Sequence, residues 1–435
     1  GQGATRTSPT MKILMGLRLY AGFETALLAG KPEFSGVPTI ARLIEGLGRT
    51  HHSVRILFAR RPGPLNWNER RDRSVSVTGI SAEMVVLAGE EAIRFLPSRL
   101  RRYLSHARHV WRFVRELWRF RPDLVYFDRG HIAAAALVSR ITRTPVVWRV
   151  MGVPESMREV LDWRGPRGWL WRWMLRSPFA AVICTLDGSG GGPWLERALR
   201  PSVERHVMMS GRDEGSGEGG ELPVEIPGGR TIVVFVGRLE SVKGIEEFLQ
   251  AFALAVSEAP NELHAVVVGG GSLEGSMREC ARSLGIDGAI TFTGAIPHVA
   301  ALRLLQFADI YVSLNRMGNL SNASLEALVA GVCMVIPVSD PATGVDLDTD
   351  ALLLRGSALR FGAVGNAGAL ARAILHLHRH PDERRDRAAK ARATAEQHLV
   401  SWDERIGREI AVLETIVVGS SFGRDHPEKR QPAKV

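Results

Sequence analysis

In the carboxyl-terminal half of the chain, short apolar runs alternate with segments whose apolar residues recur at helical spacing. Residues 231–236 read TIVVFV, a β-branched run with the length of a strand buried on both faces. Gly237 ends this run, and from Ile245 to Phe252 apolar side chains return every three or four residues. The alternation predicts further strands at 264–268, 289–293, 309–313 and 332–337, and helices at 244–257, 272–284, 298–306 and 323–330. Such regular alternation indicates a doubly wound parallel sheet.

The amino-terminal half shows a similar but less regular alternation. Strands are predicted at 11–15, 54–58, 75–87, 124–127, 146–150, 179–184 and 205–209, and helices at 37–47, 98–121 and 132–141. The fold class is therefore α/β, with two Rossmann-like doubly wound domains of parallel sheet. The cleft between two such domains is the expected ligand site.

Segments without apolar periodicity set the domain boundaries. Residues 211–229 are rich in Gly, Glu and Pro and are typical of an interdomain linker. We expect a disordered leader at 1–10, domains at 11–210 and 230–400, a C-terminal helix at 401–422 and a disordered polar tail at 423–435. The region past residue 366 is predicted to be mostly helical, with a charged interruption around 380–387.

The predicted helix at 98–121 carries two adjacent stripes. One is apolar and contains Leu100, Leu104, Ala107, Trp111, Val114 and Trp118; the other contains Arg101, Arg108, Arg112, Arg115 and Arg119. Two interpretations are open. The helix either packs its apolar stripe on the sheet, or presents it with the Trp-rich segment 163–178 to an acidic lipid surface.

Composition and charge narrow the classes of protein and partner. The 435 residues suit two domains, and 56 Lys and Arg against 46 Asp and Glu give a net charge of +10, which favours anionic partners. No recognisable nucleic-acid module accompanies the charge, so we expect no nucleic-acid partner. No apolar run approaches the ~20 residues of a membrane span, and residues 1–10 lack the apolar core of a secretory signal.

The three cysteines indicate a reducing compartment. Cys184, Cys280 and Cys333 are widely separated and lie in or beside apolar runs, as reduced core thiols do. We therefore expect a cytoplasmic protein, with peripheral association at the inner face of the membrane as an open alternative.

Arg238 and Lys243 are the leading candidates for ligand binding. Arg238 follows the carboxyl end of the predicted strand at 231–236, and Lys243 precedes the next helix. Ligands of open parallel sheets collect at this edge, where helix N-termini offer free N–H groups. Two cations there suit a diphosphate. The alternative is that both are solvated residues of an ordinary βα unit.

A second candidate segment, residues 319–327, lies between a predicted strand and a helix. Its short polar residues can cap the helix and present N–H groups to phosphate, while Glu326 can accept hydrogen bonds from sugar hydroxyls. An N-cap followed by a surface glutamate explains the spacing equally well.

Two further patterns do not support a cofactor. The glycines at 269–271 do not complete a dinucleotide fingerprint, because Glu274 stands where its third glycine belongs. The acidic run Asp346, Asp348 and Asp350 lacks the Gly and Glu of an EF-hand loop, so we interpret it as a solvated acidic loop. No metal site is expected.

Three segments together resemble a known family. They are GRLESVKG at 237–244, VVVGGGSLEGSMRECARSLGIDGAITFTGAI at 266–296 and NLSNASLEALVAGVCMVIP at 319–337, with weaker matches at 34–48, 121–128 and 144–152. The chain is similar to the retaining glycosyltransferases of family four, the glycosyl transferases group 1, over most of residues 11–416. That resemblance implies the GT-B fold. It also implies sugar transfer from a nucleotide-sugar donor to a glycan or lipid-linked acceptor, with retained configuration, in polysaccharide biosynthesis.

The resemblance also implies roles for individual residues. Arg238 and Lys243 would contact the donor diphosphate, and Glu326 would hold the ribose hydroxyls. Further donor-binding residues would be Gly36, Gly237, Gly294, Ile296, Asn319, Leu320, Ser321 and Asn322, and the acceptor would meet Asp128, His131, Met151 and Gly152. The domain at 11–210 would bind the acceptor and the domain at 230–400 the donor. No cofactor or metal is implied, because the two cations do the work of the ion.

Two positions depart from the family pattern. Gly318 stands eight residues before Glu326, where the family commonly has a glutamate, and Met151 stands where a histidine is frequent. The departures leave the donor sugar open. They also keep two alternatives: a GT-B-like epimerase or phosphorylase, and a degenerate glycosyltransferase-like binding protein in polysaccharide assembly.

Overall fold

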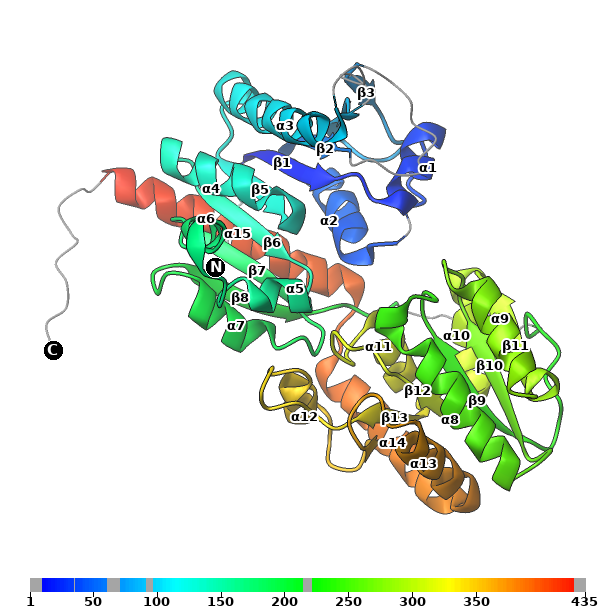
Figure 1. Ribbon diagram of the computed structural model, residues 1–435. Coiled ribbons are helices and arrows are strands. Elements are labelled where there is room, and N and C mark those ends of the chain that lie inside the picture. Colours follow the sequence, from blue (N-terminus) through cyan, green and yellow to red (C-terminus); the bar gives the residue numbers. More distant parts are fainter. Residues whose placement is uncertain (1–9, 35, 61–70, 91–96, 214–220, 426–435) are drawn as a thin grey trace, which may run out of the picture.

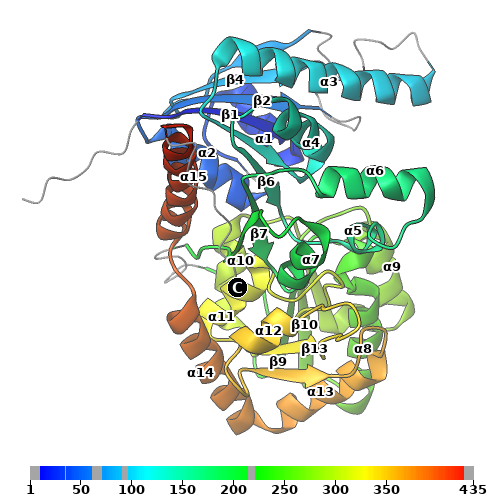
Figure 2. The same cartoon turned by 90° about the vertical axis from the view of Figure 1, so that its left-hand side faces the viewer.

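The computed structural model describes residues 10–34, 36–60, 71–90, 97–213 and 221–425. Two α/β domains lie one above the other, joined by two crossings of the chain (Figures 1 and 2). Most of the predicted leader and tail, and the centre of the predicted linker, fall outside the described residues.

Within the described residues, the N-terminal sheet has eight strands in the order β3-β4-β2-β1-β5-β6-β7-β8. They are β1 (Lys12–Arg18), β2 (Ser53–Ala59), β3 (Arg73–Val75), β4 (Ala82–Leu87), β5 (Leu124–Asp128), β6 (Val146–Val150), β7 (Ala181–Leu186) and β8 (Glu204–Met209). The helices are α1 (Ala21–Ala29), α2 (Pro38–Gly48), α3 (Ser98–Phe120), α4 (Ile132–Ile141), α5 (Glu155–Glu159), α6 (Gly165–Leu175) and α7 (Gly191–Ala198). The single strand predicted at 75–87 is wrong: β3 and β4 pair antiparallel across a turn in which Gly79 has φ +79°.

The C-terminal sheet has, in the same part of the chain, six parallel strands in the order β11-β10-β9-β12-β13-β14. They are β9 (Thr231–Val236), β10 (Leu263–Val268), β11 (Ile290–Gly294), β12 (Ile310–Val312), β13 (Cys333–Pro337) and β14 (Ala358–Phe361). The helices are α8 (Ile245–Glu258), α9 (Glu274–Ser283), α10 (His298–Phe307), α11 (Asn322–Ala330), α12 (Leu347–Leu352), α13 (Ala367–Arg379) and α14 (Pro381–His398). The predicted alternation of strands and helices is confirmed.

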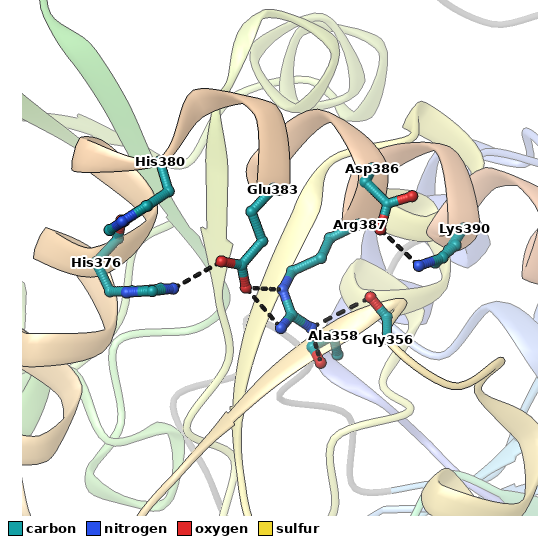
Figure 3. Close-up of polar contacts among 8 residues, drawn as sticks. All are labelled: Gly356, Ala358, His376, His380, Glu383, Asp386, Arg387 and Lys390. Carbon is teal, nitrogen blue, oxygen red and sulfur yellow. Dashed lines mark hydrogen bonds and ion pairs between the residues drawn. The ribbon is translucent and has the colours of Figure 1, made fainter.

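A charged cluster joins α14 to the edge of the C-terminal sheet (Figure 3). Glu383 lies 2.7 Å from His376 of α13 and accepts hydrogen bonds from Arg387, which also donates to the carbonyl oxygens of Gly356 and Ala358 beside and within β14. The interruption predicted around 380–387 is therefore a break at His380 alone. Pro381 opens α14 at its first position, and the charged residues are helical.

The last helix, α15 (Trp402–Asp425), returns to the N-terminal domain and lies along it (Figures 1 and 2). Its apolar residues Trp402, Ile406, Leu413, Ile416 and Val417 are part of the core formed by β1, β2 and α2. The chain therefore crosses between the domains a second time after α14.

Helix α3 packs on the sheet with the face opposite its predicted apolar stripe. Phe113 and Leu117 are buried, whereas Leu100, Leu104, Trp111 and Trp118 are 46%, 42%, 59% and 69% exposed. The helix forms the outer edge of the N-terminal domain, on the side away from the C-terminal domain (Figure 2). The helix therefore packs on its sheet, as one interpretation held, but the predicted apolar stripe is not the face that packs.

Candidate functional site

The loop that carries Arg238 is held between two neighbouring βα turns. Gly237 N–H donates to the Val268 carbonyl and Leu239 N–H to the Gly270 carbonyl, both at 3.0 Å. Gly269 has φ +126°, and a Cβ there would lie 2.1 Å from the Gly237 carbonyl oxygen. The glycine run at 269–271 thus lets two backbones approach closely and fixes the loop at the carboxyl end of β9.

Lys243 faces the N-terminal domain across the interdomain cleft. Burial lowers the pKa of its ammonium, Arg238 lowers it further, and Asp187 and Glu240 oppose the shift. Burial in turn raises the pKa of Asp187, although Ser189 and Lys243 counter it. Both groups are shifted toward their neutral forms, because desolvation outweighs their attraction. A half-buried Lys243 near the Arg238 guanidinium is an electrostatically costly arrangement that an anionic ligand would relieve.

A cavity of about 450 Å³ lies between the domains beside this loop. Gly36 and Arg42 line it from one domain, and Asn322 and Glu326 from the other. His298 Nε2 lies 2.8 Å from Glu326 Oε1 on the cavity wall. The hydrogen bond with Glu326 raises the pKa of His298, while burial opposes the rise. Arg42 reaches Asp213, in the predicted linker, at 2.8 Å. Arg238 and Lys243 do not line this cavity, so the cleft has two parts.

Asn319 belongs to a buried network of hydrogen bonds. Its Nδ2 donates to Asp346 Oδ2 at 2.6 Å, its backbone N–H donates to Asp346 Oδ1 at 2.7 Å, and its own Oδ1 accepts from Ser313. Asp346 is 1% exposed. The interpretation of 346–350 as a solvated acidic loop is therefore wrong: Asp346 fixes the 319 loop, and Asp350 pairs with Arg360. Within the described part of the chain, no three His, Cys, Asp or Glu side chains are grouped to hold a metal.

The 319 loop also contacts the N-terminal domain directly. Leu320 N–H donates to the Asp187 carbonyl at 3.2 Å, and Asp346 N–H donates to the Gly188 carbonyl at 2.7 Å. A Cβ on Gly318 would lie 2.3 Å from the Gly188 carbonyl carbon. This close approach is a physical reason for glycine at position 318.

A third group of predicted residues lies at the carboxyl ends of β1, β5 and β6. The Asp128 carboxylate is fully buried, with Oδ1 2.6 Å from His131 Nδ1 and Oδ2 accepting from the Tyr20 hydroxyl at 2.7 Å. Burial disfavours the charged carboxylate, but His131 and these hydrogen bonds prevail and lower the pKa of Asp128. The Tyr20 hydroxyl also lies 3.9 Å from Met151 Sδ.

Gly152 connects this group to Asp187. It has φ +80°, and a Cβ there would lie 2.0 Å from Asp187 Oδ2. Contacts therefore run from Asp128 through Tyr20 and Met151 to Gly152 and Asp187, and Asp187 interacts electrostatically with Lys243.

The remaining predicted residues have local structural roles. Ser321 caps α11 by accepting from Ser324 N–H, Leu320 and Ile296 pack in the core, and Gly294 has φ +66° beside the 269 turn. Sequence reasoning missed Asp187 and His298. Asp187 follows strand β7 at the same sheet edge as Asp128, so its position was a usable signal. No feature of the sequence pointed to His298, because its contact with Glu326 comes from the packing of α10 against α11.

Comparison with known proteins identifies one family and several relatives. Residues 223–394 match the family model for glycosyl transferases group 1. A segment of 171 residues is 34% identical to 2-deoxystreptamine N-acetyl-D-glucosaminyltransferase of Streptomyces fradiae, covering 39% of this chain and 36% of that protein. Another segment, of 89 residues, is 40% identical to D-inositol 3-phosphate glycosyltransferase of Rhodococcus erythropolis and covers 19% of each. The matched segments thus span about a third or less of these curated relatives.

Solved structures match over nearly the whole chain. Sucrose-phosphate synthase from Thermosynechococcus elongatus superposes with a TM-score of 0.69 at 15% identity, covering 93% of this chain and 99% of that one. Anabaena HepE, solved in complex with UDP and glucose, gives 0.62 at 15% identity, with 93% and 99% covered. At such identities these likenesses establish the two-domain fold.

Proposed function

We propose that this protein is a retaining glycosyltransferase, because its residues 223–394 match the model for glycosyl transferases group 1 and its chain has the GT-B fold. It moves a sugar from a nucleotide-sugar donor to a glycan or lipid-linked acceptor. The observation that carries the proposal is the presence of two cations, Arg238 and Lys243, on one βα turn, where Lys243 interacts electrostatically with both Arg238 and Asp187 of the other domain.

The two parts of the cleft suit the two ends of a nucleotide sugar. Glu326, half-buried on the wall of the cavity between the domains, can accept hydrogen bonds from ribose hydroxyls. Arg238 and Lys243 stabilise the negative charge that develops on the diphosphate as the bond between the donor sugar and the diphosphate breaks. In this proposal the cations take the charge-neutralising role of a metal ion, so a chelator should leave turnover unchanged.

The test uses purified protein and a panel of UDP-, GDP- and ADP-sugars. Nucleotide release should fall by roughly 10²- to 10³-fold in Arg238→Ala and Lys243→Ala. Arg379→Ala, which removes a surface ion pair with Glu258, should retain wild-type turnover. Wild-type turnover in both cleft variants would refute the proposal. An isomerised donor without nucleotide release would favour an epimerase, and binding without turnover a degenerate protein.

We further propose that α3 holds the protein at an anionic membrane surface on the cytoplasmic side. Its exposed face combines Leu100, Leu104, Trp111 and Trp118 with flanking arginines, and the Arg115 guanidinium lies 5.5 Å from the Trp111 ring centre. Trp169 and Leu170 of α6 are exposed on the same domain. Apolar side chains beside arginines suit insertion among acidic lipid headgroups. In the described part of the chain, no helix has the length and apolarity to cross a bilayer.

Sedimentation with phosphatidylserine vesicles tests this association. The double variant Trp111→Ala, Trp118→Ala should bind roughly tenfold more weakly than wild type, because it loses exposed apolar area that the lipid would cover. The matched control is Leu254→Ala, Phe307→Ala, which removes two exposed apolar side chains from the other domain. Absence of wild-type protein from the pellet at low salt would exclude the membrane surface as a partner.

A further inference from the structure

A second cavity, of about 590 Å³, lies in the N-terminal domain between the sheet and the first turns of α3. Basic side chains dominate its lining: Arg18, Arg60, Arg102, His106, His109 and His131. Among the described residues that line it, Glu90 is the acidic side chain. Three arginines against one glutamate give the described lining an excess of positive charge.

The topology places this cavity where open sheets bind ligands. Arg18 ends β1, Arg60 follows β2, and His131 follows β5, and these three strands are neighbours in the order β2-β1-β5. Their carboxyl ends meet at one edge of the sheet. His131 is held by Asp128 through Nδ1, so the cavity adjoins the group of residues that leads to Asp187 and the cleft.

The face of α3 that covers the sheet is polar in the first half of the helix and apolar in the second half. Its second half packs there with Phe113 and Leu117, as expected of a helix that only fills a core. In its first half the same face carries Arg102, Ser105, His106 and His109, which line the cavity at helical spacing. Ser105 and His109 are buried, whereas Arg102 and His106 are exposed. Burying two polar side chains costs free energy that apolar residues would not cost, which points to a ligand on this face.

His109 is buried in the wall of this cavity. Its Nε2 lies 3.0 Å from the Ala88 carbonyl oxygen, which favours the charged ring. Burial nevertheless lowers the pKa of His109 to about 4, and His131, His106 and Arg108 each lower it further. Cations converge on this volume from both the helix and the sheet edge.

We propose that the cavity binds a phosphate group carried by the acceptor. The inference rests on the proposed sugar transfer and specifies its substrate class: an acceptor whose phosphate lies among Arg18, Arg60 and Arg102 while its remainder extends toward Gly152 and the cleft. An arginine guanidinium can donate two parallel hydrogen bonds to two oxygens of one phosphate. The phosphate belongs either to a soluble sugar phosphate or to a lipid headgroup, since α3 carries the cavity on one face and the exposed apolar stripe on the other.

Calorimetry on the full chain tests the proposal with three probes: glucose 6-phosphate, dihexanoyl phosphatidic acid below its micelle concentration, and glucose. At least one phosphate probe should bind wild type, and glucose should not. Arg102→Gln and His106→Gln should each weaken phosphate binding by roughly tenfold. Arg115→Gln removes the same charge from the solvent face of the same helix and should bind like wild type. The tighter of the two phosphate probes identifies the source.

UDP binding measured on the same samples separates this proposal from the proposed function. If UDP binds and neither phosphate probe does, or if Arg115→Gln weakens phosphate binding as much as Arg102→Gln, the phosphate site is refuted. If phosphate binds but neither UDP nor any other nucleotide diphosphate does, the phosphate site stands and the sugar-transfer proposal fails.

Discussion

At the scale of single residues, the contact between His298 and Glu326 makes the structure of the cleft depend on the protonation of His298. Their side chains are 2.8 Å apart, and Asp213 of the linker lies 3.8 Å from the other ring nitrogen of His298. Protonated His298 therefore bridges the C-terminal domain and the segment that leads into it. The same contact holds Glu326 in place before a ribose reaches it.

This contact predicts a pH-dependent stability. The hydrogen bond that protonated His298 donates to Glu326 raises the pKa of His298 above its usual 6.5. The folded protein therefore binds the proton more tightly than the unfolded chain. The stabilisation is complete below pH 6.5 and is lost as pH rises through the raised pKa. Urea unfolding from pH 6 to 9 should show a decline in wild type that is smaller in His298→Gln. The control His51→Gln, an exposed imidazole elsewhere, should decline like wild type; equal slopes in all three would contradict the prediction.

At the scale of elements, the sequence predicted best where strands are buried on both faces. The strands β9 to β13 appear within a residue or two of their predicted bounds, because a continuous apolar run between glycines leaves little choice of position. Helix α3 shows the opposite case. Its apolar stripe predicted burial on the sheet, yet His109, Phe113 and Leu117 face the core. Periodicity locates a stripe, but which face is covered depends on neighbours that a single helix does not reveal.

The candidate site likewise contains residues that the sequence pointed to and residues that it did not. Arg238, Lys243 and Glu326 could be proposed from the sequence because βα turns of one domain follow directly from the strand pattern. Asp187 and His298 were not, since their roles depend on which loop of one domain meets which turn of the other. The prediction for Asp346 was wrong because an acidic run is usually exposed to solvent. Here the carboxylate is buried and accepts three hydrogen bonds, from Asn319 and Thr349.

At the scale of the whole molecule, a buried charge cluster ties the end of the chain to the first domain. Glu409 of α15 accepts from the Tyr126 hydroxyl at 2.8 Å and pairs with Arg405 at 2.8 Å and Arg149 at 3.6 Å. Burial opposes the charge on Glu409, but Arg149 and Arg405 prevail and lower its pKa. The N-terminal domain is thus completed by residues 196 to 200 positions downstream of its own last strand, β8, which ends at Met209. Arg405 also donates to the Met209 carbonyl. The two domains should therefore unfold together.

Glu409→Gln tests that coupling. The amide can still bond to Tyr126 but leaves two buried guanidiniums without a counter-charge, so unfolding free energy should fall by about 3 kcal/mol or more. Glu404→Gln, on the same helix but in an exposed pair with Arg408, should change it by less than about 1 kcal/mol. Guanidinium titrations followed by circular dichroism and by tryptophan fluorescence should give coincident transitions in wild type and the control. In Glu409→Gln the tryptophan signal should move to lower denaturant first, because nine of the ten tryptophans lie before residue 200 and the tenth, Trp402, belongs to α15. A single, unshifted transition would show that the cluster does not hold the helix to the domain.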